Sequence, residues 1–340
     1  MNNIILLVIG IIVATFLFFY KNKKLICLMY HNVLIEGKTG IISKKEFEDH
    51  MEYIKNMKSY KMEELEKLNY KLPKNSILIT FDDGYKNNYT NAFPILKKYG
   101  IKATIFLNTR YVGKDPYYLN WSEIKEMYES GLIDFQMHTH SHFPTIRKIE
   151  IKGFFENDEI DFVKREYYSI FDKNEKYNNF KNLDFTNLPV FKIRSQISIP
   201  GYRLKENFLE EYKKIIKKES FIELSSKKKK ETINNYLKKN KNKYFEKITK
   251  KEFLEIVRAE ILINKNLIEE KINKKVEYLA YPWGHKFKGN QQYIRKLGVK
   301  GFLFTSNKKN NLKINLNKIT RINGDKIKEK EKFVKRLKNI

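Results

Sequence analysis

Short apolar runs alternate with amphipathic segments along most of this chain. Runs of β-branched and other apolar residues predict buried strands, and apolar positions three and four apart predict helices. The expected strands are Leu25–Tyr30, Ile77–Phe81, Ala103–Leu107, Ile133–Met137, Val276–Ala280 and Gly301–Phe304. Four helices are expected. The first begins at the capping box Ser43–Glu46, and the second spans Asn91–Tyr99. The third begins at a Ser122 cap and ends at Gly131, and the fourth spans Lys251–Ile272. This alternation predicts a parallel sheet or barrel with its site at the carboxyl ends of the strands.

The alternation stops between Arg147 and Lys250, where charged stretches surround the low-complexity run Ser225–Lys230. We interpret residues 147–250 as an insertion that forms a lid over part of the site. The main domain is then expected at 25–325, followed by a basic helix at 326–340.

The N-terminal segment 1–24 contains an uncharged apolar run, Ile4–Tyr20. Its length is near the lower limit for a membrane-spanning helix, and it lacks a clear cleavage site. We therefore expect an uncleaved membrane anchor. The lysines that follow it, Lys21, Lys23 and Lys24, favour a cytoplasmic domain. The function inferred below instead favours an extracytoplasmic one, and that is the localisation we expect.

The formal net charge of the 340 residues is +28. The lysines are spread along the whole chain, with no arginine–aromatic cluster and no nucleic-acid motif, so we expect no nucleic-acid partner. The single cysteine, Cys27, excludes an internal disulfide.

Two adjacent acids, Asp82 and Asp83, end the strand that begins at Ile77, and Gly84 follows them. Because successive strand side chains point in opposite directions, the two carboxylates are expected to have different tasks. One would hold a metal ion and the other would act as a base. The alternative is a simple strand-ending turn in which an aspartate caps the next helix.

Three histidines, His138, His140 and His142, follow the strand Ile133–Met137. On a helical turn, His138 and His142 would share a face and chelate one divalent ion, with an aspartate from elsewhere completing the set. On an extended strand all three would share a face, which makes His140 the reserve ligand. Imidazole and carboxylate ligands suit zinc, and also cobalt, nickel or iron.

The motifs Thr80-Phe81-Asp82-Asp83-Gly84 and His138-Thr139-His140-Ser141-His142 resemble those of the polysaccharide deacetylases, the NodB-homology family. Two further motifs, Tyr30-His31-Asn32-Val33 and Ala280-Tyr281-Pro282-Trp283-Gly284, resemble the poly-N-acetylglucosamine deacetylase branch. The resemblance implies an α/β fold, a distorted (β/α) barrel, and metal-dependent removal of N-acetyl groups from the hexosamines of a cell-surface polysaccharide.

The resemblance also implies a role for each matching residue. Asp82 would be the general base and His31 the general acid, while the metal ligands would be Asp83, His138 and His142. The family's arginine–proline motif has no clear counterpart here, and Arg321 is our candidate for orienting Asp82. Substrate contacts are expected from Tyr85, Pro282 and Trp283. The alternative function is a non-catalytic glycan-binding protein on the same scaffold, which would need neither the acid pair nor the histidines.

Overall fold

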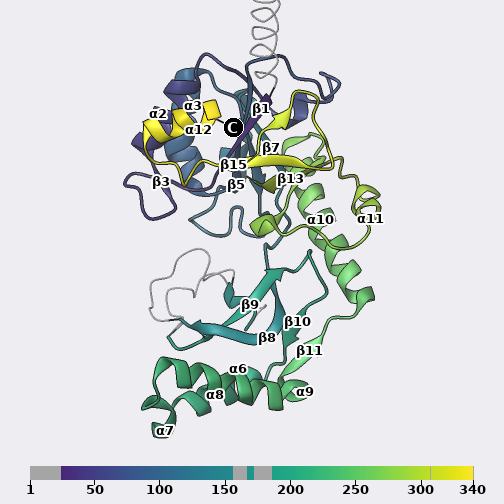
Figure 1. Ribbon diagram of the computed structural model, residues 1–340. Helices are drawn as coiled ribbons and strands as arrows, with labels where there is room; N and C mark the ends of the chain where they lie inside the picture. The colour runs from purple at the N-terminus through teal and green to yellow at the C-terminus, as the bar shows by residue number, and fades with distance from the viewer. Residues whose placement is uncertain (1–23, 156–166, 172–185, 307, 340) are drawn as a thin grey trace, which may run out of the picture. The chain divides into compact units, whose positions relative to one another are not determined.

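The computed structural model describes residues 24–155, 167–171, 186–306 and 308–339, and it contains two compact units (Figure 1). Unit 1 comprises Met1–His138, Asn264–Ala280 and Gly298–Ile340. Unit 2 comprises Thr139–Ile263 and Tyr281–Leu297.

Unit 1 is built around a closed barrel of seven parallel strands. In barrel order they are β1 (Lys24–Tyr30), β15 (Ile319–Asn323), β13 (Gly301–Thr305), β12 (Tyr278–Ala280), β7 (Ile133–Met137), β6 (Ala103–Leu107) and β5 (Ser76–Asp83). The pairing of β1 with β5 closes the barrel, with Ile26 opposite Ile77 and Tyr30 opposite Phe81. The expected α/β barrel is confirmed. All seven carboxyl ends therefore lie at one rim, where parallel α/β folds carry their sites.

Shorter strands and the helices complete unit 1. β4 (Lys58–Tyr60) extends the sheet beside β5, and β14 (Asn310–Asn311) runs antiparallel to β1. A two-stranded sheet joins β2 (Val33–Leu34) and β3 (Ile42–Ser43). The remaining elements are α2 (Lys44–Ile54), η1 (Met62–Glu64), η2 (Asn88–Ala92), α3 (Phe93–Tyr99), α4 (Trp121–Glu129) and α12 (Lys330–Asn339).

Local signals explain where several helices begin and end. The Ser43 side chain accepts a hydrogen bond from the Glu46 backbone, and the Glu46 side chain accepts one from the Ser43 backbone, so the predicted capping box is confirmed. α3 ends at Gly100, which has the left-handed conformation (φ 62°) that glycine adopts at low cost. The predicted Ser122 cap is wrong. Asn120, two residues before Ser122, caps α4 instead, because its side chain accepts a hydrogen bond from the Glu123 backbone N–H.

Unit 2 contains a four-stranded antiparallel sheet and a layer of helices. The strand order is β11 (Phe245–Lys247), β10 (Tyr202–Leu204), β8 (Pro144–Phe154) and β9 (Pro189–Ser195). The helices of this segment are α6 (Phe208–Ile216), α7 (Glu219–Ile222), α8 (Ser226–Lys239) and α9 (Lys241–Tyr244). Buried aromatic rings, among them Phe191, Phe208 and Phe245, form its core. The unit also includes η4 (Pro282–Gly284) and α11 (Gln291–Arg295). The 147–250 boundaries and the lid role stay predictions.

α10 (Lys250–Ile272) is the long amphipathic helix predicted at 251–272. Its buried positions include Phe253, Val257, Ile261 and Ile268, which recur at helical spacing. The first part of α10 is assigned to unit 2, and the part from Asn264 onward to unit 1.

The expected membrane anchor is not supported. Among the described residues, no helix has the length and apolar character needed to span a bilayer. The apolar run Ile4–Tyr20, on which the expectation rested, lies outside the described residues. The membrane-anchored, extracytoplasmic localisation is therefore withdrawn.

The Ser43 cap can be tested by its contribution to stability. Ser43→Ala removes the side-chain acceptor at the start of α2, so we expect the free energy of unfolding to fall by about 1 kcal/mol. Denaturant unfolding followed by circular dichroism measures the change. Ser43→Thr keeps a hydroxyl acceptor and serves as the control, with a smaller loss expected. Equal losses in the two variants would show that the cap bond is not the cause.

Candidate active site

The acid pair stands at the carboxyl end of β5, and both side chains are buried. Asp83 and Gly84 both have left-handed backbone conformations, with φ of 74° and 76°. A Cβ atom on Gly84 would lie 2.5 Å from Leu107 Cδ2, so a larger residue would displace the Leu107 side chain and strain the backbone at this positive φ. The backbone thus leaves the regular strand at Asp83, and the two neighbouring carboxylates acquire different partners.

Asp82 pairs with Arg321 of β15. Arg321 Nη1 donates to Asp82 Oδ1 over 2.5 Å and Nη2 donates to Oδ2 over 2.7 Å, which is a bidentate ion pair. Both side chains are almost fully buried, and the guanidinium carbon lies 5.5 Å from the centre of the Phe106 ring. Burial opposes ionisation of Asp82, but the charge and the hydrogen bonds of Arg321 outweigh it and hold the pKa well below its usual range. Asp82 is therefore a carboxylate at neutral pH.

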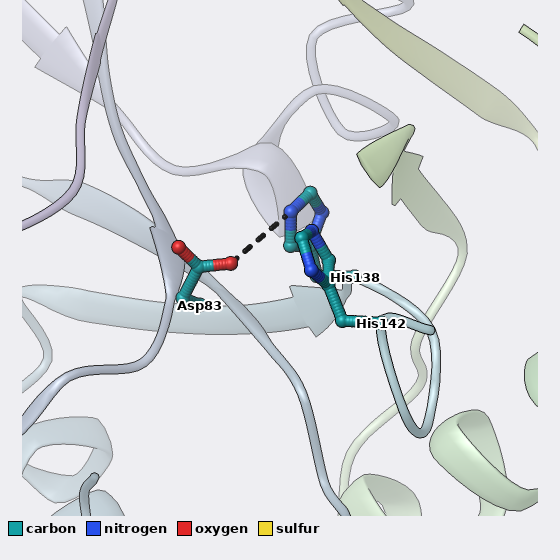
Figure 2. A group of neighbouring side chains, drawn as sticks. All are labelled: Asp83, His138 and His142. Atoms are coloured by element: carbon teal, nitrogen blue, oxygen red, sulfur yellow. Dashed lines mark ion pairs between the residues drawn. The ribbon is translucent and has the colours of Figure 1, made fainter. Parts of the chain in front are cut away.

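Asp83 meets the histidines predicted as its partners (Figure 2). Asp83, His138 and His142 are all buried, each offers one ligand atom, and these atoms lie within 4.8 Å of one another. Asp83 Oδ1 is 3.4 Å from His138 Nε2 and accepts a hydrogen bond from Asn108 Nδ2 over 3.0 Å.

The donor set fits a divalent transition metal, since two imidazoles and one carboxylate are a common ligand combination. The His138 ring supports this, because its Nδ1 is hydrogen-bonded to the Ala280 carbonyl over 2.9 Å. A carbonyl oxygen only accepts, so Nδ1 carries a proton, and Nε2, on the side of Asp83, is the nitrogen placed to bind a metal ion.

The histidines reach this arrangement by neither of the two predicted geometries. His138–Phe143 is an irregular loop between β7 and β8, and Thr139 and His142 have positive φ values of 75° and 58°. His140 is not part of the ligand group found among the described residues, and its backbone N–H donates to the Glu260 carbonyl. The left-handed residues bend the chain so that the first and last histidines converge.

His31 follows the last residue of β1 and pairs with Asp325. His31 Nδ1 lies 2.7 Å from Asp325 Oδ2, and the His31 side chain is 34% exposed whereas Asp325 is 4% exposed. Burial lowers the pKa of His31, but the hydrogen bond and charge of Asp325 outweigh it and raise the pKa to about 9. His31 is thus an accessible, protonated imidazole at neutral pH.

The sequence analysis missed Asp325 and Asn108. Asp325 stands two residues after β15, and Asn108 stands one residue after β6. Asn108 follows a predicted strand, and this position could have identified it, because strand ends at one rim are neighbours in a barrel. No strand was predicted at β15, so the sequence analysis had no such signal for Asp325.

The predicted substrate-contact residues differ in their surroundings. Trp283 is half-buried, has a left-handed backbone (φ 52°), and its ring centre lies 4.3 Å from that of His142. Pro282 and Tyr85 are buried, and the Tyr85 ring packs against Tyr118 at 5.1 Å. Of the three, Trp283 is therefore the least buried, and its ring lies beside a predicted metal ligand.

Residues 69–180 of the chain match the family model for polysaccharide deacetylases. The candidate polysaccharide deacetylase YxkH of Bacillus subtilis is 40% identical over 127 residues, which cover 36% of this chain and 44% of that protein. The poly-beta-1,6-N-acetyl-D-glucosamine N-deacetylase of Staphylococcus aureus is 35% identical over 144 residues, which cover 36% of this chain and 50% of that protein. The chain therefore spans about half the length of the curated relatives that it matches.

A solved structure of a de-N-acetylase from Aggregatibacter actinomycetemcomitans has a TM-score of 0.56 at 14% identity, covering 88% of this chain and 95% of that one. At this identity the likeness concerns the fold, and it agrees with the barrel described above. The resemblance recognised in the motifs is confirmed by these matches, and the matched segment 69–180 contains the acid pair and all three histidines.

The buried ion pair can be tested through stability. Arg321→Met leaves Asp82 buried without its cation, so we expect a loss of about 3–5 kcal/mol in the free energy of unfolding. Adding Asp82→Asn removes the unpaired negative charge, so the free energy of unfolding of the double variant should be higher than that of Arg321→Met. Denaturant unfolding of both variants measures this. If the double variant is as unstable as Arg321→Met, the cost comes from packing and not from the unpaired charge.

Proposed function

We propose that this protein is a metal-dependent hydrolase that removes N-acetyl groups from N-acetylhexosamine residues of a polysaccharide. The observation that carries the proposal is the convergence of an ionised, buried carboxylate, Asp82, with the Asp83–His138–His142 ligand set at one rim of the barrel. The matched relative named as a poly-beta-1,6-N-acetyl-D-glucosamine N-deacetylase makes poly-N-acetylglucosamine the first substrate to test.

In this proposal Asp83, His138 and His142 hold a divalent ion, with zinc as the first choice and cobalt, nickel or iron as alternatives. When bound, such an ion polarises the amide carbonyl and lowers the pKa of a water molecule. Asn108 and the Ala280 carbonyl keep Asp83 and His138 oriented as ligands.

Asp82 is proposed as the general base. Arg321 holds the carboxylate in one orientation and in its ionised form, and Asp82 Oδ2 lies 3.9 Å from His138 Nε2, beside the ligand set. The carboxylate accepts a proton from water while the water oxygen forms a bond to the carbonyl carbon. The negative charge that develops on the carbonyl oxygen needs a donor, and the backbone N–H of Tyr85 is our candidate.

His31 is proposed as the general acid. Asp325 occupies Nδ1, so Nε2 is the nitrogen that delivers its proton. The carbon–nitrogen bond breaks as the amide nitrogen takes that proton, and the products are acetate and a free amine. Trp283 is proposed to stack on a sugar ring, with Pro282 shaping the same contact.

The base assignment predicts the behaviour of Asp82→Asn. An amide cannot accept the water proton, so acetate release from N-acetylglucosamine oligomers should fall by roughly 10²–10⁴-fold. Metal content should stay at the wild-type level, because Asp83 and both histidines are retained. Wild-type protein treated with a chelator is the control and should lose activity as well.

Two results would contradict the proposal in different ways. Metal-dependent acetate release that survives Asp82→Asn would refute the base assignment. Wild-type protein that binds the glycan but neither carries metal nor releases acetate would favour the alternative, a non-catalytic glycan-binding protein.

The His31–Asp325 pair predicts a pH effect. Activity needs protonated His31 and is lost as pH rises through its pKa. Because Asp325 raises that pKa, Asp325→Asn should move the alkaline limb of the kcat profile to lower pH by roughly one to three units. Glu329→Gln, an exposed carboxylate later in the same segment, is the control and should leave the limb in place. An unmoved limb in Asp325→Asn would show that His31 is not the acid.

A further inference from the structure

The loop that carries the histidines is bonded to the side chain of Glu260, a buried residue of α10. Glu260 Oε2 accepts the Ser141 backbone N–H over 2.8 Å, and Oε1 accepts the Ser141 hydroxyl over 2.7 Å. The Glu260 backbone carbonyl accepts the His140 N–H over 3.0 Å. One residue of a 23-residue helix thus bonds two consecutive residues of a loop that has no regular structure of its own.

This loop needs external bonds to keep its shape. Thr139 and His142 both have left-handed backbone conformations, which are strained for residues other than glycine. Inside the loop, the His142 N–H donates to Thr139 Oγ1 over 3.2 Å. The Glu260 bonds fall on Ser141 and His140, between the two strained positions, where they oppose relaxation of either one.

The chemistry at Ser141 requires an acceptor at position 260. Ser141 Oγ receives a hydrogen bond from Gln196 Nε2 over 2.9 Å and another from the Phe143 N–H over 3.3 Å. A hydroxyl has a single hydrogen to donate, and these two donors direct it toward Glu260. The second carboxylate oxygen is needed for the Ser141 N–H, so a carboxylate satisfies both donors and an amide satisfies only one.

We propose that Glu260 is a positioning residue that holds His142 and His138 in metal-binding geometry through Ser141. The inference rests on the proposed function, because it takes Asp83, His138 and His142 as the ligand set. Glu260 acts on the shape of the loop and takes no part in proton transfer. Its removal is therefore expected to change metal affinity and coordination before it changes any chemical step.

The test measures metal binding by the 340-residue chain without reference to activity. Metal-free wild type, Glu260→Ala and Glu260→Gln are titrated with Zn²⁺ against a competing chelator, and with Co²⁺ by visible absorption. We expect a 10–100-fold higher Kd for Glu260→Ala, the range typical of lost support behind metal ligands, with an altered Co²⁺ spectrum. Glu260→Gln should fall between it and wild type. Glu255→Ala, an exposed position on the same helix, is the matched control and should bind as wild type.

Ser141→Ala tests whether the effect passes through this residue. It removes the hydroxyl bond and keeps the backbone one, so its loss of affinity should be smaller than that of Glu260→Ala. The double variant should bind metal no more weakly than Glu260→Ala alone, because both changes act on one connection. If Glu260→Ala does not fold, the metal affinities of Glu260→Gln and Ser141→Ala are compared with that of wild type instead.

The outcomes separate the two proposals. Wild type that binds neither Zn²⁺ nor Co²⁺ would overturn the proposed function. Wild type that binds metal, together with Glu260→Ala and Glu260→Gln that bind it equally well and give the same Co²⁺ spectrum, would overturn the role of Glu260 alone.

Discussion

The ion pair between Asp82 and Arg321 is the constraint on which the site depends. β5 and β15 both neighbour β1, so the pair reaches across one strand inside the barrel. The Arg321 and Asp82 side chains are only 1% and 4% exposed, so each charge depends on the other in place of most of its solvent. Removal of either charge would leave the other buried without a partner. The bidentate contact therefore stabilises the register of β5, β1 and β15. That register also sets His31 level with Asp82, because the preceding residues, Tyr30 and Phe81, are paired.

The two ion pairs keep the proposed base and the proposed acid in opposite charge states although they lie close together. Arg321 keeps Asp82 anionic, and Asp325 keeps His31 cationic. Both partners come from β15 and the turn that follows it, so this one segment determines the protonation state of the proposed base and of the proposed acid. Separation of two titratable groups into opposite states at the same pH is what acid–base catalysis of an amide requires.

The ligand set depends on a different kind of support. Asp83, Thr139 and His142 all have left-handed backbones, and polar contacts from other segments hold the residues around them. Strained loops give precise placement only while their neighbours oppose relaxation. This is why Asn108 and Glu260, which need not touch a substrate, belong to the account of the site.

The sequence by itself determined the strand–helix alternation, the Ser43 capping box and the Asp82-Asp83-Gly84 end of β5. These are local effects of apolar spacing, hydrogen bonding within one turn and the freedom of glycine. Arg321 was suggested as the residue that orients Asp82 because the family's arginine–proline motif has no clear counterpart in this sequence. Tertiary structure alone decided that His138 and His142 meet through an irregular loop and that Asp325 pairs with His31 and raises its pKa. The physical reason is distance along the chain: Asp325 lies 294 residues from His31, and only closure of the barrel makes them neighbours. No local sequence pattern indicates such a contact. The apolar run Ile4–Tyr20 is a local pattern, but by itself it was not enough to establish a membrane anchor.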